Sequence, residues 1–162
     1  MKKNILILFI AFMFISCTSF PKSTSNYYFS SDDKTYLYEV KNINVSIDYV
    51  NDKIVAKQIK DNVESLLYAN QRFINDATTI NIDIDVNQRS FIKNIEQKNS
   101  IYISFVGYTD EGFIILRENV YITGNKNLIS TVDQYNSITP IVKRMIKQQT
   151  LHNEKSNETN EN

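Results

Sequence analysis

The residue types that most often cross-link a fold or catalyse a reaction are scarce in this chain of 162 residues. Cys17 is the only cysteine, His152 is the only histidine, and tryptophan is absent. Without a second cysteine there is no disulfide framework, so the core alone must hold the fold. The chain also has only two prolines and three glycines, which argues against a repetitive or turn-dense β protein.

Few residues are available for catalysis. His152 follows the last predicted helix, where it is not held rigidly enough to serve as the base of a nucleophilic mechanism. The glycines Gly107, Gly112 and Gly124 do not form a phosphate-binding loop of either common spacing. The sequence offers no set of zinc ligands. We therefore predict that the protein is not an enzyme and that it uses no cofactor and no metal.

Asp83 and Asp85 form the one carboxylate pair that resembles a metal site, because they lie two residues apart in a predicted strand. Hard-cation sites need six or more oxygen ligands, usually from a loop that curls around the ion. An extended strand does not curl in this way. We therefore interpret the pair as part of a solvated face of a sheet.

The charge balance excludes another class of function. The chain contains eighteen basic and eighteen acidic residues. Removal of residues 1–16 takes away two lysines and no acid, which leaves a net charge of about −2 at neutral pH. Nucleic-acid binding needs a concentrated basic face, so no nucleic-acid partner is expected. The sequence also shows no polybasic run that would attract an anionic membrane leaflet.

The first seventeen residues have the layout of an export signal. Lys2 and Lys3 precede an apolar run over 5–15, which is too short to span a bilayer. The run ends in Phe14-Ile15-Ser16-Cys17. This ending resembles the lipobox of bacterial lipoproteins, in which the cysteine receives a diacylglycerol, with fatty acids such as palmitate, and becomes the N-terminus after cleavage. The resemblance implies lipidation at Cys17.

Two alternatives to lipidation stay open: an ordinary signal peptide that leaves a free thiol at Cys17, and an uncleaved anchor. Acylation gives the only cysteine of an exported protein a role, so we favour it. Two acyl chains hold a protein stably on a membrane. Thr18 stands where lipoproteins retained in the inner membrane of enteric bacteria carry aspartate. We therefore expect an outer-membrane location facing the periplasm.

Hydrophobic periodicity predicts one domain between flexible ends. Period-two alternation is typical of strands and three- to four-residue spacing is typical of helices. We expect a flexible tether over 17–35, the domain over 36–151 and a disordered tail over 152–162. Inside the domain we expect strands over 36–50, 79–89, 100–108 and 112–123, a loop over 91–99, and helices over 52–70 and 130–151, the second kinked or restarted at Pro140.

The order β-α-β-β-β-α predicts an α+β two-layer sandwich, with two helices covering one face of a mixed four-stranded sheet. This order, together with the lipobox, is similar to two groups of envelope lipoproteins. One plugs the barrel that assembles lipopolysaccharide, and the other assists lipid transporters of the ABC type. The likeness implies a non-catalytic accessory subunit that binds an envelope protein. The rival prediction is a carrier or sensor of a small apolar ligand held between sheet and helices.

Aromatic residues suggest where a partner would bind. Tyr102, Tyr108, Phe113 and Tyr121 fall in the last two predicted strands. With helices on one side only, these rings would stand in water on the open face of the sheet, and exposed aromatic clusters are typical of contact surfaces. The alternative is that the segment over 27–29, or an added strand, covers them. An internal apolar cavity would favour the carrier, and a filled core would favour the partner-binding protein.

Overall fold

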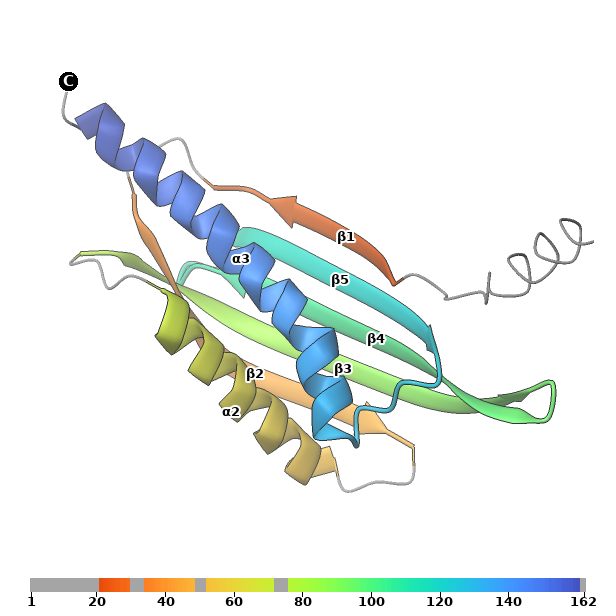
Figure 1. The fold of residues 1–162 in the computed structure, drawn as a ribbon. Helices are drawn as coiled ribbons and strands as arrows, with labels where there is room; N and C mark the ends of the chain where they lie inside the picture. The colour runs from red at the N-terminus through yellow and green to blue at the C-terminus, as the bar shows by residue number, and fades with distance from the viewer. Residues whose placement is uncertain (1–20, 30–33, 49–51, 72–75, 161–162) are drawn as a thin grey trace, which may run out of the picture.

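The computed structural model describes residues 21–29, 34–48, 52–71 and 76–160, with side chains described as far as Lys155. They form one mixed sheet of five strands in the order β1-β5-β4-β3-β2, with two helices on one face (Figure 1). The elements are β1 (Lys22–Tyr27), β2 (Tyr36–Ile47), α2 (Asp52–Asn70), β3 (Thr78–Lys93), β4 (Glu96–Tyr108), β5 (Ile114–Gly124) and α3 (Thr131–Asn160). The α+β class is therefore confirmed, but the sheet has five strands where four were predicted.

The unit from β2 to β3 follows the predicted pattern. β2 pairs with β3 in parallel, and α2 makes the connection between them. Val55, Ile59 and Val63 form the buried stripe of α2, at the three- to four-residue spacing of an amphipathic helix. Asp52, the first residue of the helix, accepts a hydrogen bond from the Ile47 amide, 3.0 Å away. Local sequence pattern and tertiary packing agree throughout this unit.

The core lies between the sheet and the two helices. β3 alternates strictly, so its isoleucines Ile80, Ile82 and Ile84 are buried on the helix side. Gly107 on β4 faces the same layer, and a Cβ atom placed there would stand only 2.8 Å from Leu116 and 2.9 Å from Ile80 and Ile82. A glycine is needed at 107 because the neighbouring strands already fill that space.

β1 is the strand that was not predicted, because it lies inside the segment expected to be a flexible tether. It pairs antiparallel with β5 and forms one edge of the sheet. On its helix side, Glu118 of β5 is fully buried and accepts hydrogen bonds from Ser25, Tyr27 and Arg144. Arg144 of α3 forms an ion pair with Glu118 at 2.9 Å, so a basic residue of the helix points to the sheet. The domain therefore begins near residue 21, not at 36.

The segment over 91–99 was predicted to be a loop, and this prediction is wrong. β3 and β4 continue their antiparallel pairing through it as far as Lys93 and Glu96. Asn94 and Ile95 make the two-residue turn, both with positive φ, 52° and 69°. The pair thus has the backbone of a tight hairpin turn. The hairpin projects past the ends of the other strands (Figure 1).

α3 continues to Asn160, well beyond the predicted end at Leu151, with Pro140 inside a single helix. The prediction of a disordered tail from 152 is therefore wrong as far as 160. His152 is half-buried: its ring stacks on Phe29 at 4.7 Å and on Tyr36 at 5.1 Å. Asn153 is buried beside it and accepts a hydrogen bond from the Tyr36 amide. These contacts with the start of β2 hold polar residues in helical conformation.

Candidate functional site on the open face of the sheet

The face of the sheet opposite the helices is polar, because the residues that alternate with the core of β3 and β4 are polar. Tyr102 of β4 and Tyr121 of β5 are direct partners in the strand register. Their side chains are 43% and 45% exposed. The structure therefore brings two of the predicted residues side by side on the open face, and neither is covered by another described element.

Hydrogen bonds fix the polar ends of both rings. The Tyr102 hydroxyl donates to Asn119 Oδ1 at 2.8 Å. Ser100 Oγ donates to the Tyr121 hydroxyl oxygen at 2.9 Å, and hydrogen bonds from Ser100 and Thr123 lower the pKa of Tyr121 below its ordinary value. A donor to the phenol oxygen favours the phenolate, which explains the direction. The rings are thus held in place while a large part of their surface stays in water.

Tyr108 and Phe113 lie elsewhere. Tyr108 is half-buried, and its hydroxyl donates to Asp83 Oδ1 at 3.0 Å. Desolvation is the main reason that the pKa of Tyr108 is raised, and the hydrogen bond to the Asp83 carboxylate adds to the effect. Six residues of strand put it about 20 Å from Tyr102. Phe113 is 70% exposed in the turn between β4 and β5, after Gly112 with its positive φ of 87°. The four predicted residues therefore form a pair and two separate positions.

The carboxylates of β3 form short amide ladders with the neighbouring strand. Asn42 donates to Asp83 at 2.8 Å, and Asn44 donates to Asp85 at 3.3 Å. Within the described ranges, no three histidine, cysteine or acidic side chains gather as a metal site would require. The arrangement gives the face a row of fixed hydrogen-bonding groups between the level of Tyr102 and that of Tyr108.

Residues 21–29, the described part of the N-terminal segment, do not cover the tyrosine pair. Tyr27 points to the helix side, where its hydroxyl donates a hydrogen bond to Glu118. Burial is the main reason that the pKa of Tyr27 is raised, and the neighbouring Glu118 adds to the effect. Phe29 stacks between Tyr27 and the ring of Tyr36. β1 does add a strand, but at the β5 edge of the sheet rather than across its face. The covering expected as an alternative is therefore absent from the described part of the chain.

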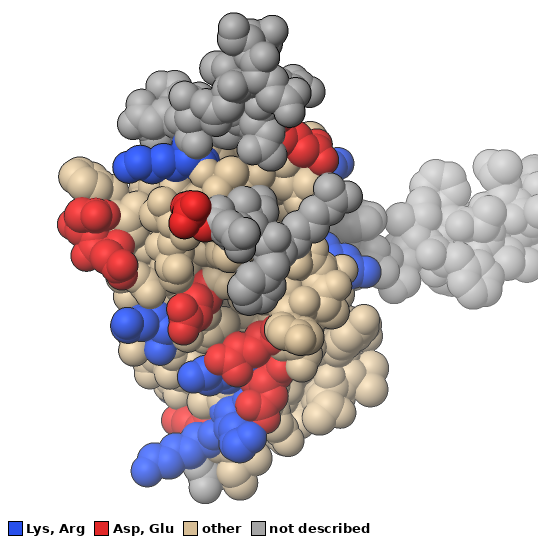
Figure 2. Space-filling model, turned by 90° about the vertical axis from the view of Figure 1, so that its left-hand side faces the viewer, with Lys and Arg blue, Asp and Glu red and all other residues tan. Residues whose placement is uncertain are grey.

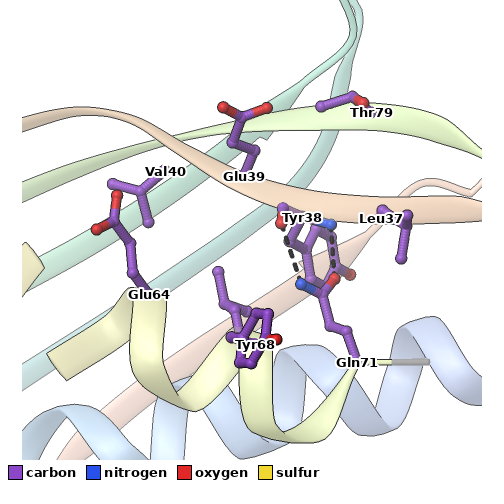
Figure 3. Close-up of a pocket in the computed structure, with 9 residues that line it drawn as sticks. Leu37, Tyr38, Glu39, Val40, Glu64, Tyr68, Gln71 and Thr79 are labelled. Carbon is purple, nitrogen blue, oxygen red and sulfur yellow. Dashed lines mark hydrogen bonds between the residues drawn. The ribbon is translucent and has the colours of Figure 1, made fainter. Parts of the chain in front are cut away.

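A groove of about 360 Å³ lies away from the tyrosine pair, between the free edge of β2 and the C-terminal end of α2 (Figure 3). Leu37, Val40 and Leu67 give it apolar walls, and Glu39 and Glu64 add two carboxylates. The residues that shape it were missed by sequence reasoning.

At this edge, one side chain forms the two backbone hydrogen bonds that a neighbouring strand would otherwise form. The Gln71 amide accepts from the Tyr38 N–H at 2.6 Å and donates to the Tyr38 carbonyl at 3.0 Å, as Figure 3 shows. A glutamine just after a helix carries no sequence signal for such a role. The groove opens at the sheet edge and is not enclosed between sheet and helices.

Comparison with known proteins identifies no family. No family model and no curated protein matches the chain. Among solved structures, the PelC dodecamer from Paraburkholderia phytofirmans matches with a TM-score of 0.45 at 9% identity. A single-residue variant of that dodecamer gives a TM-score of 0.42 at 8% identity. In both cases the match covers 75% of this chain and 96% of the other.

Two further observations concern the membrane. None of the described helices has both the length and the hydropathy needed to cross a bilayer. Cys17, the predicted lipidation site, lies outside the described residues.

Proposed function

We propose that this chain is a lipid-anchored lipoprotein of the bacterial envelope, a non-catalytic accessory subunit that binds a protein partner through the open face of its sheet. The observation that carries the proposal is the Tyr102–Tyr121 pair, exposed and in register on a face without helices. Tyrosine is enriched where proteins meet proteins, because one side chain offers both a large apolar surface and a polar tip.

The fixed geometry of the pair supports binding. A side chain already held by hydrogen bonds loses less conformational entropy when a partner covers it. Both tyrosine hydroxyls are held in this way, by Asn119 and Ser100. The Asn42–Asp83 and Asn44–Asp85 hydrogen bonds, farther along the same face toward Tyr108, offer further polar contacts to a partner. Hydrogen-bonding groups around an apolar centre are the usual anatomy of a protein interface.

The lipobox-like sequence supports the location. Acylation at Cys17 would hold the domain on a membrane, and Thr18 after it favours the outer membrane facing the periplasm. Mass spectrometry of the mature protein tests this part directly. The expected result is a diacylated Cys17 as the first residue, and an unmodified thiol at Cys17 would overturn it.

The double variant Tyr102→Ser with Tyr121→Ser tests the binding face. Because both rings are nearly half exposed, we expect the fold to keep its stability while partners captured by crosslinking in intact cells are lost. Tyr135→Ser is the matched control, since Tyr135 is 50% exposed on α3, on the other side of the molecule. Loss of folding with unchanged crosslinks would mean that the pair belongs to the core.

One observation favours the rival function, a carrier or sensor of a small apolar ligand. The groove beside Leu37 and Leu67 has a volume within the range of ligand sites, roughly 300–1,000 Å³. Native mass spectrometry of the purified protein tests it. A carrier would show a bound small molecule that disappears in Leu37→Asp, whereas a protein without a bound molecule would leave the partner-binding function as the better account.

A further inference from the structure

The chain between the proposed anchor and the sheet is very short. β1 begins at Lys22, and only four residues, 18–21, separate it from Cys17. Five residue steps reach about 17 Å when fully extended. The inference below rests on the proposed lipidation at Cys17. Given that anchor, the end of the sheet at which β1 starts stays within this distance of the membrane surface.

The β3–β4 hairpin projects from this same end of the sheet. Lys22 pairs with Tyr121, and Tyr121 pairs with Tyr102, so the start of β1 is level with Tyr102. From Tyr102 to Ile95 at the tip is seven residues of strand, about 23 Å. The tip therefore reaches farther from the sheet than the extended linker does. With the strands upright on the membrane, the tip must meet the layer that holds the acyl chains.

The hairpin tip exposes two isoleucines among the polar residues Lys93, Asn94 and Glu96, and one of the isoleucines is strained. Ile95 is 100% exposed and Ile92 is 80% exposed. Ile95 has a φ of 69°, a backbone conformation that suits glycine or asparagine and disfavours a β-branched residue. Two isoleucines exposed to this degree contribute little or nothing to the core of the domain. Strain of this kind points to function, because the fold alone would be better served by glycine.

We propose that the tip of this hairpin, around Ile92 and Ile95, inserts into the interface of the membrane that holds the lipid anchor. The tip is a second, non-covalent contact beside the acyl chains. Together the two contacts fix the orientation of the domain, with the open face of the sheet turned sideways. Phe113, in the turn at the opposite end of β4, then points away from the membrane.

Other exposed side chains at this end fit the same surface. Ile129 and Val132, beside the start of α3, are 46% and 66% exposed. They are held there because Gln88 of β3 accepts a hydrogen bond from the Leu128 amide. The anchor end of the domain thus presents apolar side chains from two separate elements toward the membrane.

The charges at this end suit anionic headgroups. Each acidic side chain is engaged within the domain, since Asp48 pairs with Arg89, Glu96 with Lys98, and both Asp52 and Asp133 accept backbone amides. Lys22, Lys93 and Lys126 form no ion pair with another described residue. At the opposite end of the domain, acidic and basic side chains also lie near one another (Figure 2). Unpaired lysines near a bilayer favour binding to anionic lipid.

Tryptophan fluorescence provides the test, because the natural chain has no tryptophan. Full-length lipidated Ile95→Trp protein is reconstituted into vesicles of phosphatidylethanolamine and phosphatidylglycerol containing a brominated phosphatidylcholine. We expect a blue-shifted emission and at least a twofold loss of intensity from the bromine atoms. Phe113→Trp is the matched control, exposed at the far end, and its emission should not change. Ile92→Trp provides a second reporter that avoids the strained position.

The outcomes separate this inference from the proposed function. Protein that floats with the vesicles, while neither hairpin reporter is quenched more than Phe113→Trp, would overturn the insertion of the tip and leave the anchor intact. Protein that does not float and carries an unmodified Cys17 would overturn both. Protection of the Ile95→Trp reporter from iodide in native envelopes, without quenching by brominated lipid, would assign the tip to a protein partner and overturn the lipid contact.

Discussion

Replacing Glu118 by glutamine tests how β1, the strand nearest the anchor, is held on the sheet. The Glu118 carboxylate is fully buried and accepts from Ser25 Oγ at 2.8 Å, from the Tyr27 hydroxyl, and from Arg144 at 2.9 and 3.3 Å. Glutamine keeps the volume, but it removes the charge and turns one acceptor into a donor among donors. The perturbation is thus electrostatic rather than steric.

The expected cost follows from the burial of the two partners. Breaking a buried ion pair by changing one member costs about 3–5 kcal/mol. The Arg144 side chain is 39% exposed and can turn partly to water, so we expect a cost at or below the lower end of that range, about 2–3 kcal/mol. That is a large fraction of a typical stability of about 5–15 kcal/mol. The loss should be concentrated in β1, because Ser25 and Tyr27 are the residues released.

Urea unfolding followed by circular dichroism measures the total effect, and hydrogen exchange locates it. Amides of β1 and β5 should exchange faster in Glu118→Gln than amides of β3. Glu64→Gln is the control, since its ion pair with Lys60 is half exposed at 3.6 Å and should contribute less than about 0.5 kcal/mol. A Glu118→Gln protein as stable as the control variant, with the β1 amides still protected from exchange, would show that Glu118 does not hold β1 on the sheet.

Three further predictions follow from single residues. Asp48→Asn should lower stability at pH 6, and the deficit should shrink progressively as pH falls below about 3.8. Hydrogen bonds from the Ser90 amide and Arg89 hold the Asp48 pKa below its usual value, so its contribution is lost as pH falls through that lowered pKa; an equal deficit in urea titrations at pH 3 and pH 6 would contradict this. Ile95→Gly should raise stability by roughly 0.5 kcal/mol, since relief of the left-handed strain exceeds the entropy cost of glycine, and a lower thermal midpoint would contradict it. Gly107→Ala should cost about 1–3 kcal/mol because its methyl group meets side chains at 2.8–2.9 Å, and a neutral result in urea would contradict it.

Elements that bury their own hydrophobic residues could be predicted from the sequence. The isoleucines of β3 and the stripe Val55, Ile59 and Val63 of α2 carry the period of a strand and of a helix, and both elements formed where expected. In such elements the local pattern and the tertiary contacts give the same answer. The α+β class follows from the order of these elements.

Elements held by distant partners could not be predicted. β1 reads Lys-Ser-Thr-Ser-Asn-Tyr, with no apolar alternation, because its edge position is fixed by pairing with β5 and by the buried Glu118. The hairpin beyond Phe91 is a strand through backbone pairing rather than through burial. The end of α3 is helical because His152 and Asn153 dock on the start of β2. In each case the decisive contact joins residues far apart in sequence.

The candidate site, too, could be predicted from the sequence only in part. Alternation in β4 was enough to place Tyr102 on the open face. The register that sets it beside Tyr121 depends on how β4 and β5 pair, and a slip of one residue would have turned one ring into the core. Phe113 was assigned to the same face, but the turn after Gly112 carries it to the end of the sheet.

Site-specific photo-crosslinking in intact cells tests directly whether a protein partner binds the open face of the sheet. A benzoylphenylalanine placed at Tyr102 of the full-length chain reports contacts on the open face, and the same probe at Tyr135 on α3 reports contacts on the helix side. If a partner binds the open face of the anchored protein, position 102 gives a discrete protein adduct that is absent from position 135 and is lost in Cys17→Ser. Equal adducts from both positions, or none from position 102 while position 135 crosslinks, would contradict it.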